Sequence, residues 1–519
     1  MRLPELLAAS AAAAAQAPLL IERDQEVSYE AVDRSATRCA WLLRRSGVLP
    51  GDRVVVALEN SAAMVAAYFG VMRAGAVAVP LPPGPRSDRL PSAVADCRPA
   101  AAIVDEPTAR AMGPRGVFDG VAAVFVAGGD VSSLAPFLDF EAALAASDES
   151  LAAVDGSDTD LAAIVYTSGS TGEPRGVMLS HRNLVANARA IVSYLGLTAR
   201  DRVMCVLPFS YVYGLSLLHT HVAVGGSVVI ENRAAFPNVV LNAMAAHRVT
   251  GFAGVPSTFA LMLHRSNLDH VALPNLRYVT QAGGAMAPAK IDEWLARGPQ
   301  APFFVMYGAT EAAARLTYLP PDELPVKRGS IGRPIPGVDI RVVTEEGRTA
   351  AAGEVGELVA SGPNIAAGYW NRPAETAERF GPDGYRTGDL GYADADGCFF
   401  IVGRRHDMIK VGANRVGARE IEDVLHAHPA VSEAVVVAAP HDLLGEVPVA
   451  FVGLTATLAD AATALRAFCA TQLAAYKVPA RVVVLTELPK LPGSGKIDRA
   501  SLRSLAAGSD AGRARSNHG

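Results

Sequence analysis

A glycine- and hydroxyl-rich segment, YTSGSTGEPRGVMLSHRN from Tyr166 to Asn183, follows a strand-like apolar run and precedes a helix-like pattern. Glycine lets several backbone N–H groups point at one anion, and hydroxyl groups add donors for phosphate oxygens. The spacing differs from the GxxxxGK[ST] loop of many nucleotide-binding proteins, because the first cation is Arg175 and glycine follows it. We therefore predict a phosphate cradle, with a plain flexible loop as the alternative for this segment taken alone. The candidate contacts are Thr167, Ser168, Gly169, Ser170, Thr171, Gly172 and Arg175.

Three further motifs carry groups that suit nucleotide chemistry. In YGATE (307–311), the carboxylate of Glu311 follows a hydroxyl at the end of an apolar run, which suits Mg²⁺, and the ring of Tyr307 offers a flat face for a base. Asp389 of YRTGDL could accept hydrogen bonds from ribose hydroxyls, and the guanidinium of Arg404 could hold two phosphate oxygens. Lys496 follows a Gly-Ser-Gly turn and could reach into an active site. Taken singly, YGATE is also compatible with an ordinary turn and Lys496 with a solvated surface residue.

The elements that must position these motifs alternate between short β-branched runs and longer helical patterns. Runs such as RVVVA (53–57), 162–166 and 277–280 predict βαβ units and mainly parallel sheets. Near residue 403 the pattern changes to one helix-like stretch, EIEDVLHAH, and three strand-like runs. We therefore predict an α/β fold: a large N-terminal domain (1–403) of mainly parallel sheets with helices plus a smaller sheet region, and a small mobile α+β C-terminal domain (404–519).

Composition argues against several classes of protein. The chain has 519 residues, half of them hydrophobic, and a net charge of -5, which disfavours a sequence-independent nucleic-acid binder. Its five cysteines lie far apart, so we expect the reduced, buried thiols of a cytoplasmic enzyme and no zinc site. The N-terminal stretch MRLPELLAASAAAAA favours an amphipathic helix over a signal peptide, and we expect no membrane span.

Taken together and in this order, the motifs resemble those of the adenylate-forming superfamily, which includes acyl-CoA synthetases, stand-alone adenylation enzymes that load carrier proteins, and luciferases. The matching stretches are YTSGSTGEPRG, YGATE, YRTGDL, GRRHDMIKVGANRVGAREIE and LPGSGKIDR, and the resemblance covers about residues 15–503. Weaker matches lie at 281–285, 353–373 and 476–479.

The resemblance implies two half-reactions. A carboxylate attacks the α-phosphate of ATP, with Mg²⁺, to give an acyl-adenylate and pyrophosphate; a thiol of CoA, or of a carrier protein's phosphopantetheine arm, then attacks the acyl carbon. The opening loop would hold the β- and γ-phosphates, Glu311 the Mg²⁺ ion and Thr310 the α-phosphate, and Lys496 would bridge acid and AMP. The other implied ATP and AMP contacts are Gly284, Ala285 and Tyr307 at the adenine, with Gly283 and Gly308 beside them, Asp389 at the ribose, and Arg404 at ribose or phosphate.

Two positions depart from the family's usual residues. Arg175 stands where lysine is commoner, so we expect Arg175→Lys to lose little adenylation and Arg175→Ala to weaken ATP use. His406 stands at the hinge about which the small domain would rotate, where aspartate or lysine is usual. Because histidine titrates near neutral pH, we predict that thioester formation depends on pH more than adenylation does. Identical pH profiles of the parent and His406→Asp, in single-turnover assays of each half-reaction, would contradict this; a tolerated substitution without consequence is the alternative.

The resemblance places the acid-binding pocket around LPFSYVYGLS (207–216), GVPSTF (254–259) and the strand before YGATE. Between Leu207 and Gly214 there is no Asp, Glu or Asn, and a buried ammonium without a carboxylate partner is costly. We therefore expect a plain carboxylic acid (fatty, aryl or alicyclic) and not an α-amino acid. The candidate pocket residues are Phe209, Tyr211, Val212, Tyr213, Gly214 and Val255, although the aromatic ones could equally be core residues.

The thiol acceptor stays open at this point. Gly412 and Ala413 match the small-residue loop that lines the pantetheine tunnel of thioester-forming relatives, but CoA and carrier proteins present the same arm. An acyl-CoA ligase and a carrier-protein ligase therefore remain side by side, with a catalytically silent acyl or nucleotide binder as a third hypothesis. A kinase or NTPase is disfavoured by the missing GK[ST] loop.

Overall fold

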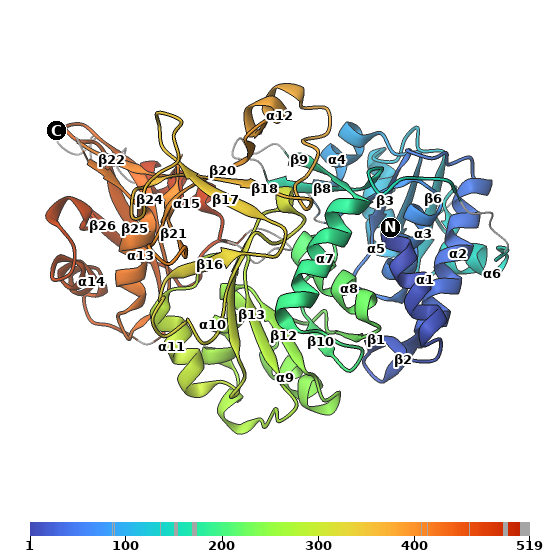
Figure 1. Ribbon diagram of the computed structural model, residues 1–519, viewed down its shortest axis with the longest axis horizontal. Coiled ribbons are helices and arrows are strands. Elements are labelled where there is room, and N and C mark those ends of the chain that lie inside the picture. Colours follow the sequence, from blue (N-terminus) through green and yellow to red (C-terminus); the bar gives the residue numbers. More distant parts are fainter. Residues whose placement is uncertain are drawn as a thin grey trace.

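Three sheets organise the chain, and helices cover them (Figure 1). The computed structural model describes residues 1–519 except 86, 88, 135, 150–153, 169–173, 406, 413, 456, 491–496 and 509–519. The sheets lie within one mixed α/β arrangement, with two sheets in the N-terminal part and a smaller one near the C-terminus. The fold class predicted from the sequence is thereby confirmed.

The first sheet has the strand order β7-β6-β5-β3-β4-β8-β9 and is parallel except for the β8–β9 hairpin. Its central strands are buried on both faces, as expected for parallel strands rich in valine and alanine. Its strands are β3 (Arg53–Ala57), β4 (Val77–Pro80), β5 (Ala101–Asp105), β6 (Ala123–Ala127), β7 (Leu138–Asp139), β8 (Leu161–Ser168) and β9 (Pro174–Ser180). The helices in this part of the sequence are α2 (Tyr29–Arg45), α3 (Ala62–Arg73), α4 (Arg89–Cys97), α5 (Glu106–Met112), the 3-10 turn η1 (Gly113–Arg115) and α6 (Phe140–Ala145).

The second sheet is the widest and changes character at β14. From β1 to β14 neighbouring strands are parallel, and from β14 through β15 and β16 to β21, β20, β18 and β17 they are antiparallel. The parallel part contains β1 (Pro18–Glu22), β11 (Ser227–Ile230), β10 (Arg202–Cys205), β12 (Gly251–Gly254), β13 (Tyr278–Gln281) and β14 (Phe303–Tyr307), with β2 (Gln25–Ser28) antiparallel at its edge. The antiparallel part contains β15 (Thr317–Leu319), β16 (Ser330–Pro334), β17 (Asp339–Val343), β18 (Gly356–Ser361), β19 (Phe380–Gly381), β20 (Gly384–Ala393) and β21 (Phe399–Arg404).

Helices and one large core join these two sheets. The main hydrophobic cluster runs from β3, β4 and β8 through α2, α3, α7 and α8 to β10–β14. At the N-terminus α1 (Leu3–Ala13) buries Leu3, Leu6 and Leu7 against this core, so the predicted N-terminal helix is confirmed. The remaining helices are α7 (His181–Leu195), α8 (Val212–Val224), α9 (Pro237–Ala246), α10 (Pro256–Arg265), η2 (Leu268–His270), α11 (Pro288–Arg297), η3 (Thr310–Ala312) and α12 (Pro373–Arg379).

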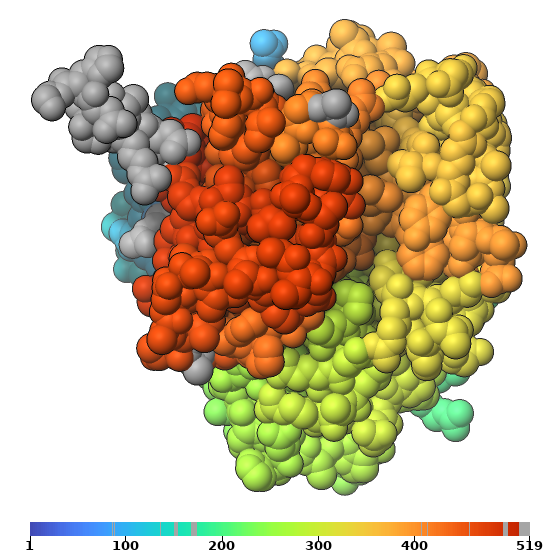
Figure 2. Space-filling view, turned by 90° about the vertical axis from the view of Figure 1, so that its left-hand side faces the viewer, coloured from blue at the N-terminus to red at the C-terminus, as the bar shows by residue number. Residues whose placement is uncertain are grey.

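The C-terminal residues build a separate small sheet, as the sequence predicts. The order is β23-β22-β25-β24, with β26 parallel to β25, and it begins just after β21 has completed the large sheet. Figure 2 shows this orange-to-red part beside yellow and above green segments of the N-terminal part. Across the junction, Arg415 Nη1 lies 2.7 Å from Glu345 Oε1. The elements are β22 (Ile409–Val411), β23 (Asn414–Val416), α13 (Ala418–His426), β24 (Val431–His441), β25 (Gly445–Leu454), α14 (Ala461–Ala470), η4 (Ala475–Lys477), β26 (Arg481–Val484) and α15 (Arg499–Gly508).

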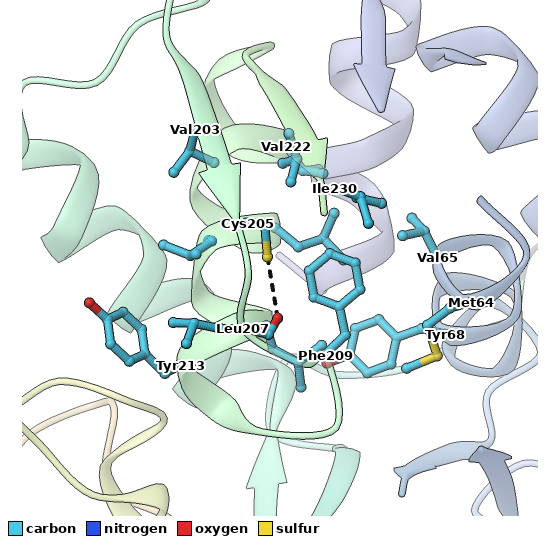
Figure 3. Close-up of a cluster of buried hydrophobic side chains, with 14 of the residues drawn as sticks. Met64, Val65, Tyr68, Val203, Cys205, Leu207, Phe209, Tyr213, Val222 and Ile230 are labelled. Carbon is cyan, nitrogen blue, oxygen red and sulfur yellow. Dashed lines mark hydrogen bonds between the residues drawn. The ribbon is translucent and has the colours of Figure 1, made fainter. Parts of the chain in front are cut away.

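The cysteines are free and buried, as expected from their spacing. One of them, Cys205, lies in the core cluster of Figure 3, where its thiol lies 3.3 Å from the Leu207 carbonyl oxygen and donates to it. Within the described ranges no group of three or more His, Cys, Asp or Glu side chains could hold a metal ion. Among the same residues, no helix combines the length and apolar character that crossing a membrane requires.

Candidate active site

The turn between β14 and β15 carries Thr310 and Glu311 and is unusually tight. A Cβ atom on Gly308 would lie 1.9 Å from the carbonyl oxygen of Ala314, so only glycine fits at this position. The Leu316 N–H donates to the Tyr307 carbonyl (2.9 Å) and closes the turn. Ala313 and Ala314 have φ of 53° and 126°, a backbone conformation that costs energy for residues other than glycine. Such strain is held in place by surrounding contacts and is common at functional sites.

Two buried asparagines supply those contacts. Asn364, in the segment after β18, donates to the carbonyls of Ala312 (3.1 Å) and Arg315 (2.8 Å). Asn187 of α7 donates to the same two carbonyls at 3.3 and 3.2 Å. Neither residue was a candidate from the sequence. The 353–373 stretch that contains Asn364 was recognised as a weak family match, which was the one signal available.

Glu311 is held by the same segment. The Tyr369 hydroxyl donates to Glu311 Oε1 (2.7 Å), and the Ala366 N–H donates to the Glu311 carbonyl (2.8 Å). Burial, followed by the nearby Glu311 charge, raises the pKa of Tyr369 above its usual range, so Tyr369 remains a donor. Glu311 Oε2 has no hydrogen bond to any residue that the structure describes. A single carboxylate with one open oxygen beside a threonine fits Mg²⁺, which keeps most of its ligands as water and phosphate.

Asp389 links three of the predicted motifs. The Tyr307 hydroxyl donates to Asp389 Oδ2 (2.5 Å), and Arg404 Nε donates to Oδ1 (3.1 Å). Asp389 and Arg404 are direct cross-strand partners on β20 and β21. Asp389 is buried, whereas 67% of the Arg404 side chain is exposed. Burial and the Asp389 carboxylate hold the pKa of Tyr307 far above its usual value, so its hydroxyl stays protonated.

The predicted adenine loop lies directly beside part of the predicted acid pocket. Gly283 has φ of +83°, and a Cβ there would lie 2.9 Å from Val255 and 3.9 Å from the ring of Tyr213. The Gln281 side chain donates to the Gly284 carbonyl (2.8 Å) and fixes the loop after β13. Tyr213 donates to the Thr280 carbonyl (3.1 Å) on the same strand. Ala285, the third predicted loop residue, follows Gly284 in this turn.

The other predicted acid-pocket residues lie in different surroundings. Gly214 lies in the first turn of α8, close to the backbone of Leu207 and Pro208, where a Cβ would lie 2.3 Å from the Pro208 carbonyl oxygen. Phe209 lies in the core cluster of Figure 3 with Tyr68, as an ordinary core aromatic. Tyr211 faces α4, where its hydroxyl accepts a hydrogen bond from Arg89 (3.4 Å). Partly buried Val212 packs against the main core cluster.

Arg315 is a buried residue beside the predicted acid pocket that the sequence alone did not single out. It lies four residues after Glu311 and is only 2% exposed, with its guanidinium 4.1 Å from the centre of the Tyr213 ring. The available signal was a lone cation between Ala314 and Leu316 in an otherwise apolar stretch.

Arg175 lies beside the predicted phosphate cradle. It pairs across the β8–β9 hairpin with Thr167, and the intervening residues 169–173, with predicted contacts Gly169, Ser170, Thr171 and Gly172, lie outside the described residues. Arg175 Nε lies 2.6 Å from Glu375 Oε2 on α12, and its guanidinium lies 5.8 Å from the centre of the Tyr369 ring. Tyr369 therefore connects Arg175 with Glu311, while the phosphate contact of Arg175 stays a prediction.

In the C-terminal part, Gly412 is exposed at the end of β22. Its φ is 59°, and its N–H donates to the Leu444 carbonyl (2.8 Å) in the β24–β25 turn. The other predicted residues of this part, His406, Ala413 and Lys496, lie outside the described residues.

Comparisons with known proteins agree with this arrangement. Family models described as "AMP-binding enzyme" and "AMP-binding enzyme C-terminal domain" match residues 7–370 and 420–496. A feruloyl-CoA synthase of Amycolatopsis sp. is 34% identical over 92% of this chain and 93% of its own, and a long-chain-fatty-acid–CoA ligase of Bacillus subtilis (strain 168) is 30% identical over 92% and 90%. The crystal structure of an anthranilate CoA ligase in complex with anthranoyl-AMP superposes with a TM-score of 0.90 at 28% identity, covering 98% of this chain and 97% of that one. The chain therefore belongs to the AMP-binding enzymes of the adenylate-forming superfamily, as its motifs predict.

Proposed function

We propose that this chain is an AMP-forming acid–CoA ligase. The observation that carries the proposal is the contact of Tyr307 and Arg404 with the two oxygens of Asp389, which brings three distant motifs to one point. Each carboxylate oxygen can accept more than one hydrogen bond, so Asp389 can hold ribose hydroxyls while it keeps both protein partners. The site thus has a place for a nucleotide next to a place for an acid.

The first half-reaction would join the acid to AMP. One oxygen of the substrate carboxylate forms a bond to the α-phosphorus of ATP, and the bond from that phosphorus to pyrophosphate breaks. Positioning and charge neutralisation dominate such a step. Thr310 would contact the α-phosphate, and Lys496 would bridge carboxylate and AMP. Mg²⁺, when bound, supplies positive charge to the phosphates, and Glu311 is the residue that would hold it.

In the second half-reaction the sulfur of CoA forms a bond to the acyl carbon, AMP leaves, and the thiol proton is lost to solvent. Both full-length relatives described above carry names of enzymes that use CoA, which favours CoA over a carrier protein. Gly412 and Ala413 would line the pantetheine path, and the part from residue 404 onward would rotate about His406 between the two steps. ATP and CoA as substrates, with five free thiols, suit the cytoplasm.

ATP–pyrophosphate exchange with a panel of carboxylic acids tests the proposal. We expect exchange that depends on an added acid, and AMP release coupled to thioester formation when CoA is present. Absence of exchange with every acid would favour a silent binder. Thioester formation on a phosphopantetheinylated carrier protein, but none on CoA, would favour the carrier-loading alternative.

A further inference from the structure

Arg315 is a buried cation without a carboxylate partner. Its Nε donates to the sulfur of Met306 and its Nη1 to the Ala314 carbonyl, both at 3.3 Å. The hydroxyl of Tyr194 also lies within hydrogen-bonding reach of the guanidinium, but no Asp or Glu in the described part of the chain pairs with it. The side chain is nevertheless 2% exposed and lies flat against Tyr213.

This arrangement is costly unless something outside the chain completes it. Arginine keeps its charge in proteins, so burial cannot be relieved by losing a proton. A thioether, one neutral carbonyl and one phenol hydroxyl carry no negative charge, so they are weaker partners for a guanidinium than a carboxylate would be. His221, nearby in the same region, adds no charge near neutral pH because burial lowers its pKa to about 4. The Asn187 and Asn364 bonds reach only the Arg315 carbonyl, so they would hold any residue there and do not account for the guanidinium.

A small, largely enclosed cavity borders the guanidinium between α7, α8, β13 and β14. Leu195 and Leu217 give it apolar walls, and Thr220 and Thr280 add hydroxyl groups. Its volume, counted as room for the centre of a water-sized sphere, is about 10 Å³. Such a space holds about one water. The space can therefore accept one oxygen atom of an anionic group but not a whole carboxylate or an acyl chain.

The position belongs to the acid side of the site. The ring of Tyr213 lies against the guanidinium, approaches Gly283 and donates a hydrogen bond to the Thr280 carbonyl. Gly283 belongs to the predicted adenine loop and Tyr213 to the predicted acid pocket, so Arg315 lies near the boundary between these two predicted pockets. Glu311, Tyr369 and Arg175 form a separate chain of contacts toward the phosphate loop. An anion at Arg315 would therefore arrive with the acid and not with the phosphates of ATP.

We propose that Arg315 binds a second anionic group of the acid substrate, distinct from the carboxylate that is activated. This inference rests on the proposed acid–CoA ligase function. Because Arg315 and Thr310 share one turn, only a short spacer separates the two ends of such a substrate. The substrate class is a compact dicarboxylic acid, and a carboxylic acid with a sulfonate at its far end shares the same chemistry.

Matched acids test the proposal. Wild type, Arg315→Met and Arg315→Lys are assayed for CoA-dependent AMP release with glutarate, adipate and isophthalate, with the corresponding monoacids, and with the diacid monomethyl esters. We expect wild type to prefer its best diacid over both analogues that lack the second charge by about tenfold or more in kcat/KM. Arg315→Met should lose about a hundredfold on that diacid and much less on the monoacid, and Arg315→Lys should recover part of the diacid activity.

Stability measurements separate this role from a structural one. Replacing an unpaired buried charge by methionine should leave Tm unchanged or raise it. The diacid should raise the Tm of wild type at concentrations where the monoacid does not, a readout that needs no variant. Equal use of diacids and monoacids by wild type, an unchanged diacid preference in Arg315→Met, or a Tm increase produced equally by chloride or phosphate would each overturn the proposal. Activity with monoacids alone would still support the ligase function, and no activity with any acid would refute that function instead.

Discussion

Arg175 and Glu375 form an ion pair, 2.6 Å between Nε and Oε2, that ties the strand leaving the predicted phosphate loop to α12. Both side chains are mostly buried, and the ring of Tyr369 covers the arginine. If Arg175 is to meet phosphate oxygens, it must share its guanidinium between Glu375 and the nucleotide. An arginine can do this because its donors are arranged in a planar fork, whereas the lysine that is usual here presents a single point charge.

Substitutions at this pair should therefore act in opposite directions on ATP use. Arg175→Ala should raise the KM for ATP about fivefold, which corresponds to about 1 kcal/mol. Glu375→Gln should lower that KM, because phosphate no longer competes with a carboxylate. Arg175→Lys should stay near wild type. Steady-state kinetics with ATP varied would measure all three. A Tm loss in both Arg175→Ala and Glu375→Gln, with an unchanged KM in each, would assign the pair to stability alone.

The two asparagines that hold the turn of Thr310 and Glu311 give a second prediction. Asn364→Asp keeps the shape of the side chain but replaces the donor by acceptors, so the carbonyls of Ala312 and Arg315 keep only their Asn187 bonds and meet a negative charge. Each lost hydrogen bond costs about 0.5–1.5 kcal/mol. Because the two asparagines position Thr310 and Glu311, we expect kcat for adenylation to fall about tenfold or more, with a smaller change in KM.

Asn238→Asp, at an exposed position on α9, is a matched control for Asn364→Asp. It should leave both kcat and Tm near wild type. If Asn364→Asp lowered Tm but kept full adenylation in single-turnover measurements at low temperature, the two asparagines would serve folding and not positioning.

The order of the motifs along the chain assigned their residues to one site, but only part of their contact follows from the sheet. Asp389 and Arg404 are cross-strand partners on β20 and β21, whereas β15, β16 and β21 separate the strand of Tyr307 from β20, so the Tyr307–Asp389 contact could not be derived from strand order. Arg315 and Asn364 could not be found in this way. The role of Asn364 depends on tertiary contacts with a strained turn, which the sequence does not show. The burial of Arg315 cannot be predicted from its neighbours in the sequence.

The directions of the side chains near the start of α8 could not be predicted from the sequence either. Phe209 and Tyr213 are both aromatic, only four residues apart and part of the main core cluster, yet only Tyr213 also approaches Gly283 beside the predicted acid pocket. Neither periodicity nor hydrophobicity distinguishes the two rings.

A buried histidine should make the fold sensitive to acid. His219 stacks on Tyr68 with Nε2 3.2 Å from the hydroxyl, and burial lowers its pKa to about 3. An unfolded histidine has a pKa of about 6.5, so between these values the unfolded chain binds more protons than the folded one. The stability that the neutral side chain contributes is complete above about pH 6.5 and is lost as the pH falls toward 3.

The size of that effect can be measured with a non-titrating residue. His219→Gln should flatten the dependence of unfolding free energy on pH, between about pH 6 and 4, by up to about 1.4 kcal/mol per pH unit. Denaturant unfolding at several pH values would show this, with His441→Gln, at an exposed position, as the control. Parallel pH profiles for wild type and His219→Gln would mean that the imidazole is not the group that titrates.

The Tyr307–Asp389 contact predicts that Tyr307 supports ribose binding indirectly, by orienting Asp389. Tyr307→Phe keeps the ring but removes the hydroxyl that holds Asp389 Oδ2, while Arg404 still holds Oδ1. Hydrogen bonds to charged groups contribute about 1.5–3 kcal/mol, so we expect kcat/KM for ATP to fall about tenfold. Tyr392→Phe is the matched control, because Tyr392 lies three residues further along β20 and stacks on Phe400. Asp389→Asn should cost more than Tyr307→Phe, since it removes the charge that both partners orient. Wild-type ATP kinetics in Asp389→Asn would contradict the ribose assignment, and equal losses in Tyr307→Phe and Tyr392→Phe would trace the effect to the sheet and not to the site.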